Sequence, residues 1–152
     1  MRVLGVCTSP EDIKWALASG TNDAPHLEGT DRKSQRLPDS EDETLKLIGL
    51  VRFVSTLLKE KQVEKVVIAS AGYSPFRGPS PARVKVECAV QLAAAEIGLP
   101  AELVAAATLR AKEKRLVEET GHSPEELLNQ SKEFSPRAWR DAAIAAWVGL
   151  PK

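Results

Sequence analysis

Residues 65–98 read KVVIASAGYSPFRGPSPARVKVECAVQLAAAEIG, and this stretch decides the fold. It contains a short apolar run, a loop rich in proline and glycine, and a long alanine-rich segment. Residues 66–69 carry no charge, so a strand there can bury both faces, as central strands of helix-flanked sheets do. We therefore predict a strand over residues 63–69 and a helix over residues 81–97. The loop between them leaves the carboxyl end of the strand, where open α/β sheets place their sites.

Two or three strands are predicted before this stretch. Residues 2–7 (RVLGVC) and residues 13–18 (IKWALA) alternate in polarity around a polar turn, which predicts an antiparallel hairpin. Residues 19–39 are polar and irregular, and within them residues 33–37 predict a third strand at an edge of the sheet. The order of elements then indicates an α/β fold, in which an antiparallel meander joins a parallel part.

Helices are predicted from capping residues and from apolar spacing. Ser40 and Glu43 form a capping box that begins a helix running to about Lys61. In the helix of residues 81–97, the predicted apolar stripe consists of Val84, Cys88, Leu92 and Ala95. Residues 101–105 predict a further strand. A helix is predicted from its cap Thr108 to about Glu119, where Gly121 closes it, and a short helix begins at Ser123. A last helix is predicted to begin at Ser135, and its core residues are Trp139, Ile144, Trp147 and Val148.

Composition limits the class of protein. A chain of 152 residues is long enough for one ordinary domain, which we place over residues 1–152. The 21 basic and 21 acidic residues give a formal net charge of zero, so no field of the whole protein attracts nucleic acid, although a local basic patch remains compatible with this balance.

The two cysteines and the lengths of the apolar runs indicate the cellular compartment of the protein. Cys7 falls in a predicted strand and Cys88 in a predicted helix, which is unlike a disulfide framework and favours a reducing compartment. The N-terminal residues lack the apolar length of a signal sequence, and no run approaches the roughly 18 apolar residues of a membrane span. We therefore expect a cytoplasmic protein without a membrane partner.

Three motifs resemble the RuvC-type branch of the ribonuclease H-like superfamily. RVLGVC at residues 2–7 resembles its first strand, which normally ends in Gly-Ile/Val-Asp. KVVIAS at residues 65–70 resembles its fourth strand, which normally ends in glutamate, and WRDAAIAA at residues 139–146 resembles its last helix, which normally carries Asp-x-x-Asp-Ala. The chain is also similar to a small group of uncharacterised bacterial proteins. The resemblance implies a ribonuclease H-like mixed sheet of about five strands flanked by helices.

The resemblance also implies a metal-dependent reaction at a set of carboxylates. In the family, two divalent ions activate water and stabilise the leaving oxygen of a phosphodiester. Here the position of the first aspartate holds Cys7, and that of the glutamate holds Ala69 or Ser70. Ala138 takes the place of one acid of the last helix, and Asp141 keeps the other. Because Mg²⁺ prefers several oxygen ligands, we expect no metal cofactor, with Mg²⁺ or Mn²⁺ bound near Asp141 as the alternative.

The loop after the central strand is a candidate anion site. Backbone N–H groups at the start of the following helix, together with nearby basic side chains, favour a phosphate or a carboxylate. The alternatives are that the loop is only a connection, and that Cys7 is a small buried apolar side chain at the end of a strand. The residues assigned to binding are Cys7, Ser70, Tyr73, Ser74, Arg77, Arg83 and Lys85.

A second basic cluster lies on the predicted helix that ends near Glu119. It contains Arg110, Lys112, Lys114 and Arg115, and glutamates interleave with it. This pattern favours a solvated helix face with ion pairs at helical spacing, and a nucleic-acid patch is the alternative.

Three hypotheses for function follow. We favour a non-catalytic, degenerate member of the fold, a pseudoenzyme that binds a protein partner, a second copy of itself or a nucleic-acid structure. The second hypothesis is a metal-dependent nuclease or hydrolase whose acidic site is rebuilt around Asp141 with Glu11, Asp12 or Glu87. The third is an anion or nucleotide sensor that uses the loop of residues 70–83.

Overall fold

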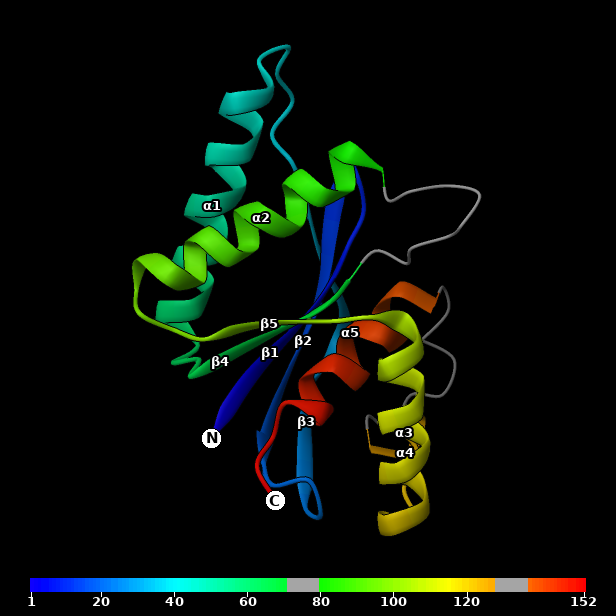
Figure 1. Ribbon diagram of the computed structural model, residues 1–152. Helices are drawn as coiled ribbons and strands as arrows, with labels where there is room; N and C mark the ends of the chain where they lie inside the picture. The colour runs from blue at the N-terminus through cyan, green and yellow to red at the C-terminus, as the bar shows by residue number, and fades with distance from the viewer. Residues whose placement is uncertain (71–79, 128–136) are drawn as a thin grey trace.

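The computed structural model describes residues 1–70, 80–127 and 137–152, with the side chains of residues 29–33 and 137 outside this description. These residues form five strands and five helices (Figure 1). In chain order they are β1 (Arg2–Thr8), β2 (Asp12–Gly20), β3 (Pro25–Arg36), α1 (Glu43–Glu60), β4 (Lys65–Ala69), α2 (Pro81–Glu96), β5 (Ala101–Val104), α3 (Ala106–Thr120), α4 (Pro124–Leu127) and α5 (Arg137–Val148).

The strands form one mixed sheet in the order β3-β2-β1-β4-β5. β1 pairs antiparallel with β2, and β2 pairs antiparallel with β3. β1 and β4 are parallel, as are β4 and β5. The predicted α/β fold, with a meander joined to a parallel part, is therefore confirmed. The apolar run of residues 66–69 lies in β4, which has a neighbouring strand on each side.

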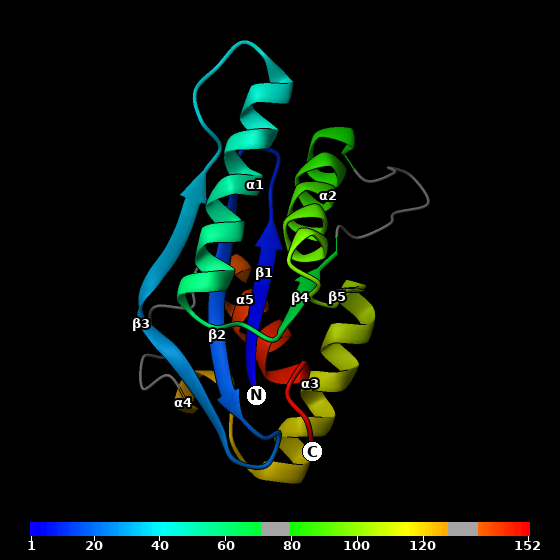
Figure 2. The ribbon, with the colours of Figure 1, turned by 90° about the vertical axis from the view of Figure 1, so that its left-hand side faces the viewer.

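Helices cover both faces of the sheet, as predicted. α1 and α2 lie on one face, and α5 lies on the other with α3 and α4 beside it (Figures 1 and 2). Successive residues of β1 point to opposite faces. Leu4 and Val6 therefore join the core beneath α1 and α2, whereas Val3 and Cys7 join the core beneath α5.

α5 packs very closely on the middle of β1. Gly5 lies directly beneath it, and a Cβ atom at this position would collide with the backbone of α5 at Ala142 and Ala146. The side chains of residues 142–146 are buried, and four of these five residues are alanine. Small side chains on both elements let the helix and the strand approach each other, and Trp147 then fills the end of this core.

Three predicted boundaries are wrong. The edge strand begins at Pro25 rather than at residue 33, because pairing with β2 orders a polar segment that has no apolar alternation of its own. Asp42 rather than Ser40 caps α1, since its Oδ1 accepts a hydrogen bond from the Thr44 N–H at 2.9 Å. α3 begins at Ala106, directly after β5, and Thr108 lies inside it.

The predicted apolar stripe of α2 lies on the wrong face. Leu92 is 60% exposed and Cys88 is exposed, whereas the buried apolar residues of this helix are Val86, Ala89, Val90, Ala93 and Ala94. Because small apolar residues occur all round this helix, their spacing did not distinguish the core face. The last helix places Ile144 and Trp147 in the core as predicted, whereas Trp139 and Val148 are only partly buried.

Among the described residues, no helix combines the length and the apolar character that crossing a membrane requires.

Replacing Gly5 by alanine tests the packing of α5. Forced overpacking against a backbone costs about 1–3 kcal/mol, and we expect Gly5→Ala to lower the free energy of unfolding by at least that amount. Urea denaturation followed by circular dichroism measures it. Ser34→Ala, on the exposed part of the edge strand, is the control and should change the free energy by less than about 0.5 kcal/mol. An unchanged unfolding free energy in Gly5→Ala would show that α5 does not pack on β1 as described.

Candidate functional site

The carboxyl ends of β1 and β4 lie side by side and bring several predicted residues together. Cys7 lies in register with Lys14 of β2 on one side and with Ala69 of β4 on the other. The first turn of α2 reaches this edge through Arg83, and α5 reaches it through Asp141. The site is therefore built by two parallel strands, one hairpin partner and two helices.

Arg83 supplies the cation nearest to the strand ends. Its Nε donates to Thr8 Oγ1 at 3.2 Å, and its Nη2 donates to the Ala69 carbonyl at 3.4 Å. The hydroxyl of Thr8 donates in turn to Glu87 Oε1 at 3.4 Å, which lies 3.9 Å from Arg83 Nε. Thr8 and Glu87 are only 4% and 5% exposed. A buried carboxylate requires a nearby positive charge, and Arg83, one turn earlier on α2, provides it.

Cys7 is a buried thiol surrounded by charges. Burial raises its pKa from 9.0 to about 11, Asp141 and Asp12 add to the rise, and Arg83 and Lys14 oppose it. The thiol is thus protonated at neutral pH, and a protonated thiol is a poor nucleophile. The alternative reading of Cys7 as a small buried side chain fits this environment.

Asp12 and Lys14 form a second charged group next to Cys7. Lys14 Nζ donates to Asp12 Oδ2 at 2.5 Å, and the Ser9 hydroxyl donates to Asp12 Oδ1 at 2.5 Å. Burial raises the pKa of the Asp12 carboxyl, but these hydrogen bonds outweigh it and leave the pKa below its usual value. Lys14 Nζ also lies 5.3 Å from the centre of the Trp139 ring on α5. The carboxylate of Asp12 is therefore paired with a lysine.

A pocket of about 190 Å³ opens beside Arg83. Arg110, from the first turns of α3, and Asp141 line it together with Ser70, above apolar walls from Ala69 and Leu109. Two guanidinium groups and one carboxylate give this pocket a formal charge of +1. Guanidinium groups bind phosphate and carboxylate oxygens in pairs, so the pocket suits an anion.

The structure brings together some predicted binding residues and not others. Ser70, Arg83 and Asp141 line one pocket, and Cys7 lies close enough to Arg83 and Asp141 for their charges to shift its pKa. Lys85 does not belong to this group, because its Nζ pairs with Glu43 of α1 at 2.9 Å. It follows Arg83 by two residues on a helix and thus points elsewhere. Tyr73, Ser74 and Arg77 lie outside the described residues.

Three residues of the site were missing from the prediction. Lys14 faces Cys7 across the hairpin that the sequence predicted, so its place could have been found from the strand register. Thr8 follows Cys7 in the chain and lies at the end of the same strand. Arg110 belongs to the second predicted basic cluster, for which a solvated helix face and a nucleic-acid patch are the alternatives, and only the structure shows that it lines this pocket.

The described carboxylates do not fit the metal site that the family resemblance implies. Within residues 1–70, 80–127 and 137–152, no group of three or more histidine, cysteine, aspartate or glutamate side chains is arranged to hold a metal ion. Asp12 and Glu87 each lie beside a basic side chain, and the Glu11 side chain is 81% exposed and 3.9 Å from Arg36. A metal site rebuilt around Asp141 requires Glu11, Asp12 or Glu87 to converge on it, and this arrangement is not found among the described residues.

The two cysteines should differ strongly in reactivity. At pH 8, iodoacetamide should alkylate the exposed Cys88 of the folded protein and spare Cys7, whose rise in pKa from 9.0 to about 11 lowers its thiolate fraction about a hundredfold. The neutral thiol stabilises the folded state below pH 9, and this contribution is lost as the pH rises through 11. Intact-protein mass spectrometry counts the adducts, and both thiols should react in urea. Rapid double alkylation of the folded protein would contradict the described burial of Cys7.

Comparisons with known proteins identify the fold. No protein-family model matches the chain, and no curated protein matches it. Among solved structures, Thermus thermophilus RuvC in complex with a Holliday junction substrate has a TM-score of 0.75 at 15% identity, covering 97% of this chain and 91% of that one. Another T. thermophilus RuvC structure has a TM-score of 0.74 at 15% identity, covering 97% of this chain and 92% of that one. The yeast mitochondrial Holliday junction resolvase has a TM-score of 0.58 at 13% identity, covering 96% and 76%. The chain has the ribonuclease H-like fold of the RuvC type.

Proposed function

We propose that this chain is a non-catalytic protein of the RuvC-type fold that binds the phosphate backbone of nucleic acid through arginine side chains. The observation that carries the proposal is the position of Arg83. Its guanidinium lies at the ends of β1 and β4, where the family resemblance places metal-binding carboxylates. A cation of the chain itself is thus present at the strand ends.

The chemistry of this cation supports binding rather than cleavage. Arginine stays protonated at all physiological pH values, so it can hold phosphate oxygens but cannot take a proton from water. The buried thiol of Cys7 is also protonated and therefore offers no nucleophile. Arg110, across the pocket from the strand ends, adds a second guanidinium for the same phosphate group.

The likeness to RuvC bound to a Holliday junction supports nucleic acid as the ligand class. The net charge of zero limits sequence-independent attraction to any duplex. We therefore expect the protein to distinguish nucleic-acid structures, with a four-way junction bound more tightly than a linear duplex of the same sequence.

Fluorescence anisotropy with labelled four-way DNA tests the proposal. We expect equal binding in EDTA and in Mg²⁺, no cleavage in either, and an affinity about tenfold lower for Arg110→Ala, because one phosphate contact is lost. Arg83→Ala should bind the four-way DNA more weakly still. It also removes the guanidinium that lies 3.9 Å from Glu87, so circular dichroism must confirm that this variant is folded, and Arg83→Lys should restore part of the binding. Arg52→Ala, on the exposed face of α1, is the matched control and should bind like the unaltered protein.

Other outcomes would replace the proposal. Mg²⁺-dependent cleavage that Asp141→Asn abolishes would identify a nuclease instead. Thermal stabilisation by nucleotides without DNA binding would identify the anion sensor, because a ligand at 100 times its dissociation constant adds about 2.7 kcal/mol. Absence of both DNA binding and nucleotide binding would favour a protein partner. The exposed Ile48 on α1 and Leu92 on α2 offer apolar surface for such a partner.

A further inference from the structure

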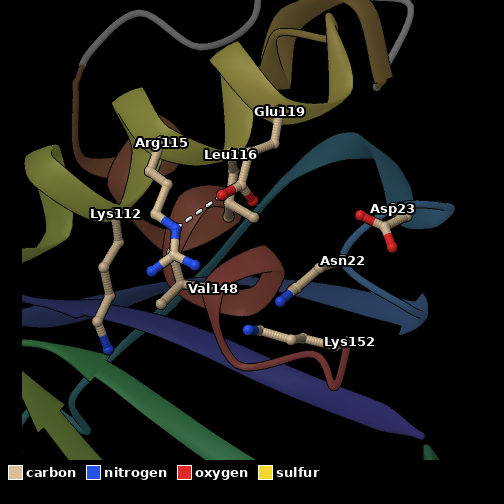
Figure 3. A pocket seen from close by; sticks show the side chains of 8 residues that line it. All are labelled: Asn22, Asp23, Lys112, Arg115, Leu116, Glu119, Val148 and Lys152. Carbon is tan, nitrogen blue, oxygen red and sulfur yellow. Dashed lines mark hydrogen bonds and ion pairs between the residues drawn. The ribbon is translucent and has the colours of Figure 1, made fainter.

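A second pocket, of about 310 Å³, lies between α3, the turn from β2 to β3, and the last residues of the chain. Figure 3 shows its side chains. It shares no lining residue with the pocket beside Arg83. It also uses Lys112 and Arg115, two members of the basic cluster that the proposed function leaves without a role. Its volume is at the lower end of the range for small-molecule sites.

Nitrogen donors from three parts of the chain face this pocket. Figure 3 shows the terminal nitrogens of Arg115, the amide nitrogen of Asn22 and Nζ of Lys152 directed into the space between α3 and the last residues of the chain. The Nζ of Lys112 lies further along the same helix, 3.9 Å from Glu102 of β5. Donors that converge in this way can share one acceptor, and the oxygens of an anion supply it.

Two of the donor residues, Arg115 and Asn22, already have hydrogen-bond partners within the chain. Arg115 Nε donates to Glu119 Oε1 at 2.8 Å, which fixes the plane of the guanidinium and leaves its terminal nitrogens facing the pocket. The Asn22 N–H donates to the Pro151 carbonyl at 2.8 Å, and Trp147 Nε1 donates to the Asn22 carbonyl at 3.0 Å. Asn22 Oδ1 is buried, so its amide nitrogen is the atom that faces outwards. Such preorganisation lowers the entropic cost of binding.

The floor of the pocket is apolar. Leu116 is 7% exposed, and Val148 is partly buried against the same core. Figure 3 shows both side chains beside Arg115, where they can contact the carbon skeleton of a ligand. A bare inorganic ion would leave this floor in water.

The basic side chains of the lining indicate a ligand with a negatively charged group. Lys112, Arg115 and Lys152 contribute three positive side chains and Asp23 and Glu119 two negative ones, a side-chain sum of +1 that does not count the main-chain carboxylate of Lys152. We infer that this pocket binds a small organic carboxylate with a compact apolar body, whose carboxylate accepts hydrogen bonds from Arg115, Asn22 and Lys152 while its carbon skeleton lies on Leu116 and Val148. The inference is independent of nucleic-acid binding at Arg83.

Titration with sodium benzoate, followed by ¹⁵N-resolved NMR, tests the inference. Benzoate should give saturable shifts in the turn at Asn22 and in α3, with a dissociation constant of about 0.1–10 mM for a ligand of this size. Arg115→Gln should weaken binding about tenfold or more, and Lys152→Gln should also weaken it, because each removes a charged partner of the carboxylate. Lys114→Gln, exposed on the same helix but outside the pocket, should bind benzoate like the unaltered protein.

Three results would overturn the inference. The first is an absence of saturable shifts at these residues up to about 10 mM benzoate, near the weak limit for a ligand of this size. The second is equal binding of benzyl alcohol, which has the ring but no charge, or of inorganic phosphate, which has the charge but no apolar body. The third is unchanged affinity in Arg115→Gln when its spectrum shows an intact fold.

Discussion

The packing of α5 on Gly5 positions much of this molecule. Because α5 can approach β1 this closely only where the strand has no side chain, the contact is centred on one glycine and on the alanines that face it. α5 then brings Asp141 to the strand ends and Trp147 to the turn at Asn22. Both pockets therefore have a wall from α5, Asp141 in one and Val148 in the other.

α5 also joins α3 and α4 to the rest of the fold. Arg140 Nε pairs with Glu125 of α4 at 2.5 Å, and its Nη2 pairs with Glu113 of α3. The hydrogen bond to Glu113, together with that to Glu125, raises the pKa of Arg140, and burial opposes this rise only in part. A single arginine thus links three helices, one of which, α3, contributes side chains to both pockets. Both pockets therefore combine side chains of α3 with a side chain of α5.

The sequence predicted the fold more completely than the site. Apolar runs, glycines and prolines show where most strands and helices lie, and their order predicts an α/β fold with a meander joined to a parallel part. The mixed sheet of about five strands flanked by helices was implied by the family resemblance. The edge strand β3 was shortened because its order comes from pairing with β2. The face of α2 was misjudged because alanine and valine occur all round it. Lys85 is wrongly assigned to the site for a different reason: it lies two residues after Arg83, and a shift of two residues on a helix turns a side chain away. The sequence prediction omits Lys14 and Thr8 because their partners at the site are distant in the chain. Lys14 lies in register with Cys7 across the hairpin, and Thr8 contacts Arg83 and Glu87 of α2.

The central claim is that Arg83, not a metal ion, supplies the positive charge at the ends of β1 and β4. Calorimetric titration of Mn²⁺ into the unaltered protein and into Asp141→Ala tests it most directly, since Mn²⁺ takes the same oxygen ligands as Mg²⁺. The account predicts no saturable binding at the site and the same heats for both proteins. Stoichiometric binding of Mn²⁺ that disappears in Asp141→Ala would contradict it, because the carboxylates would then hold a metal ion beside Arg83.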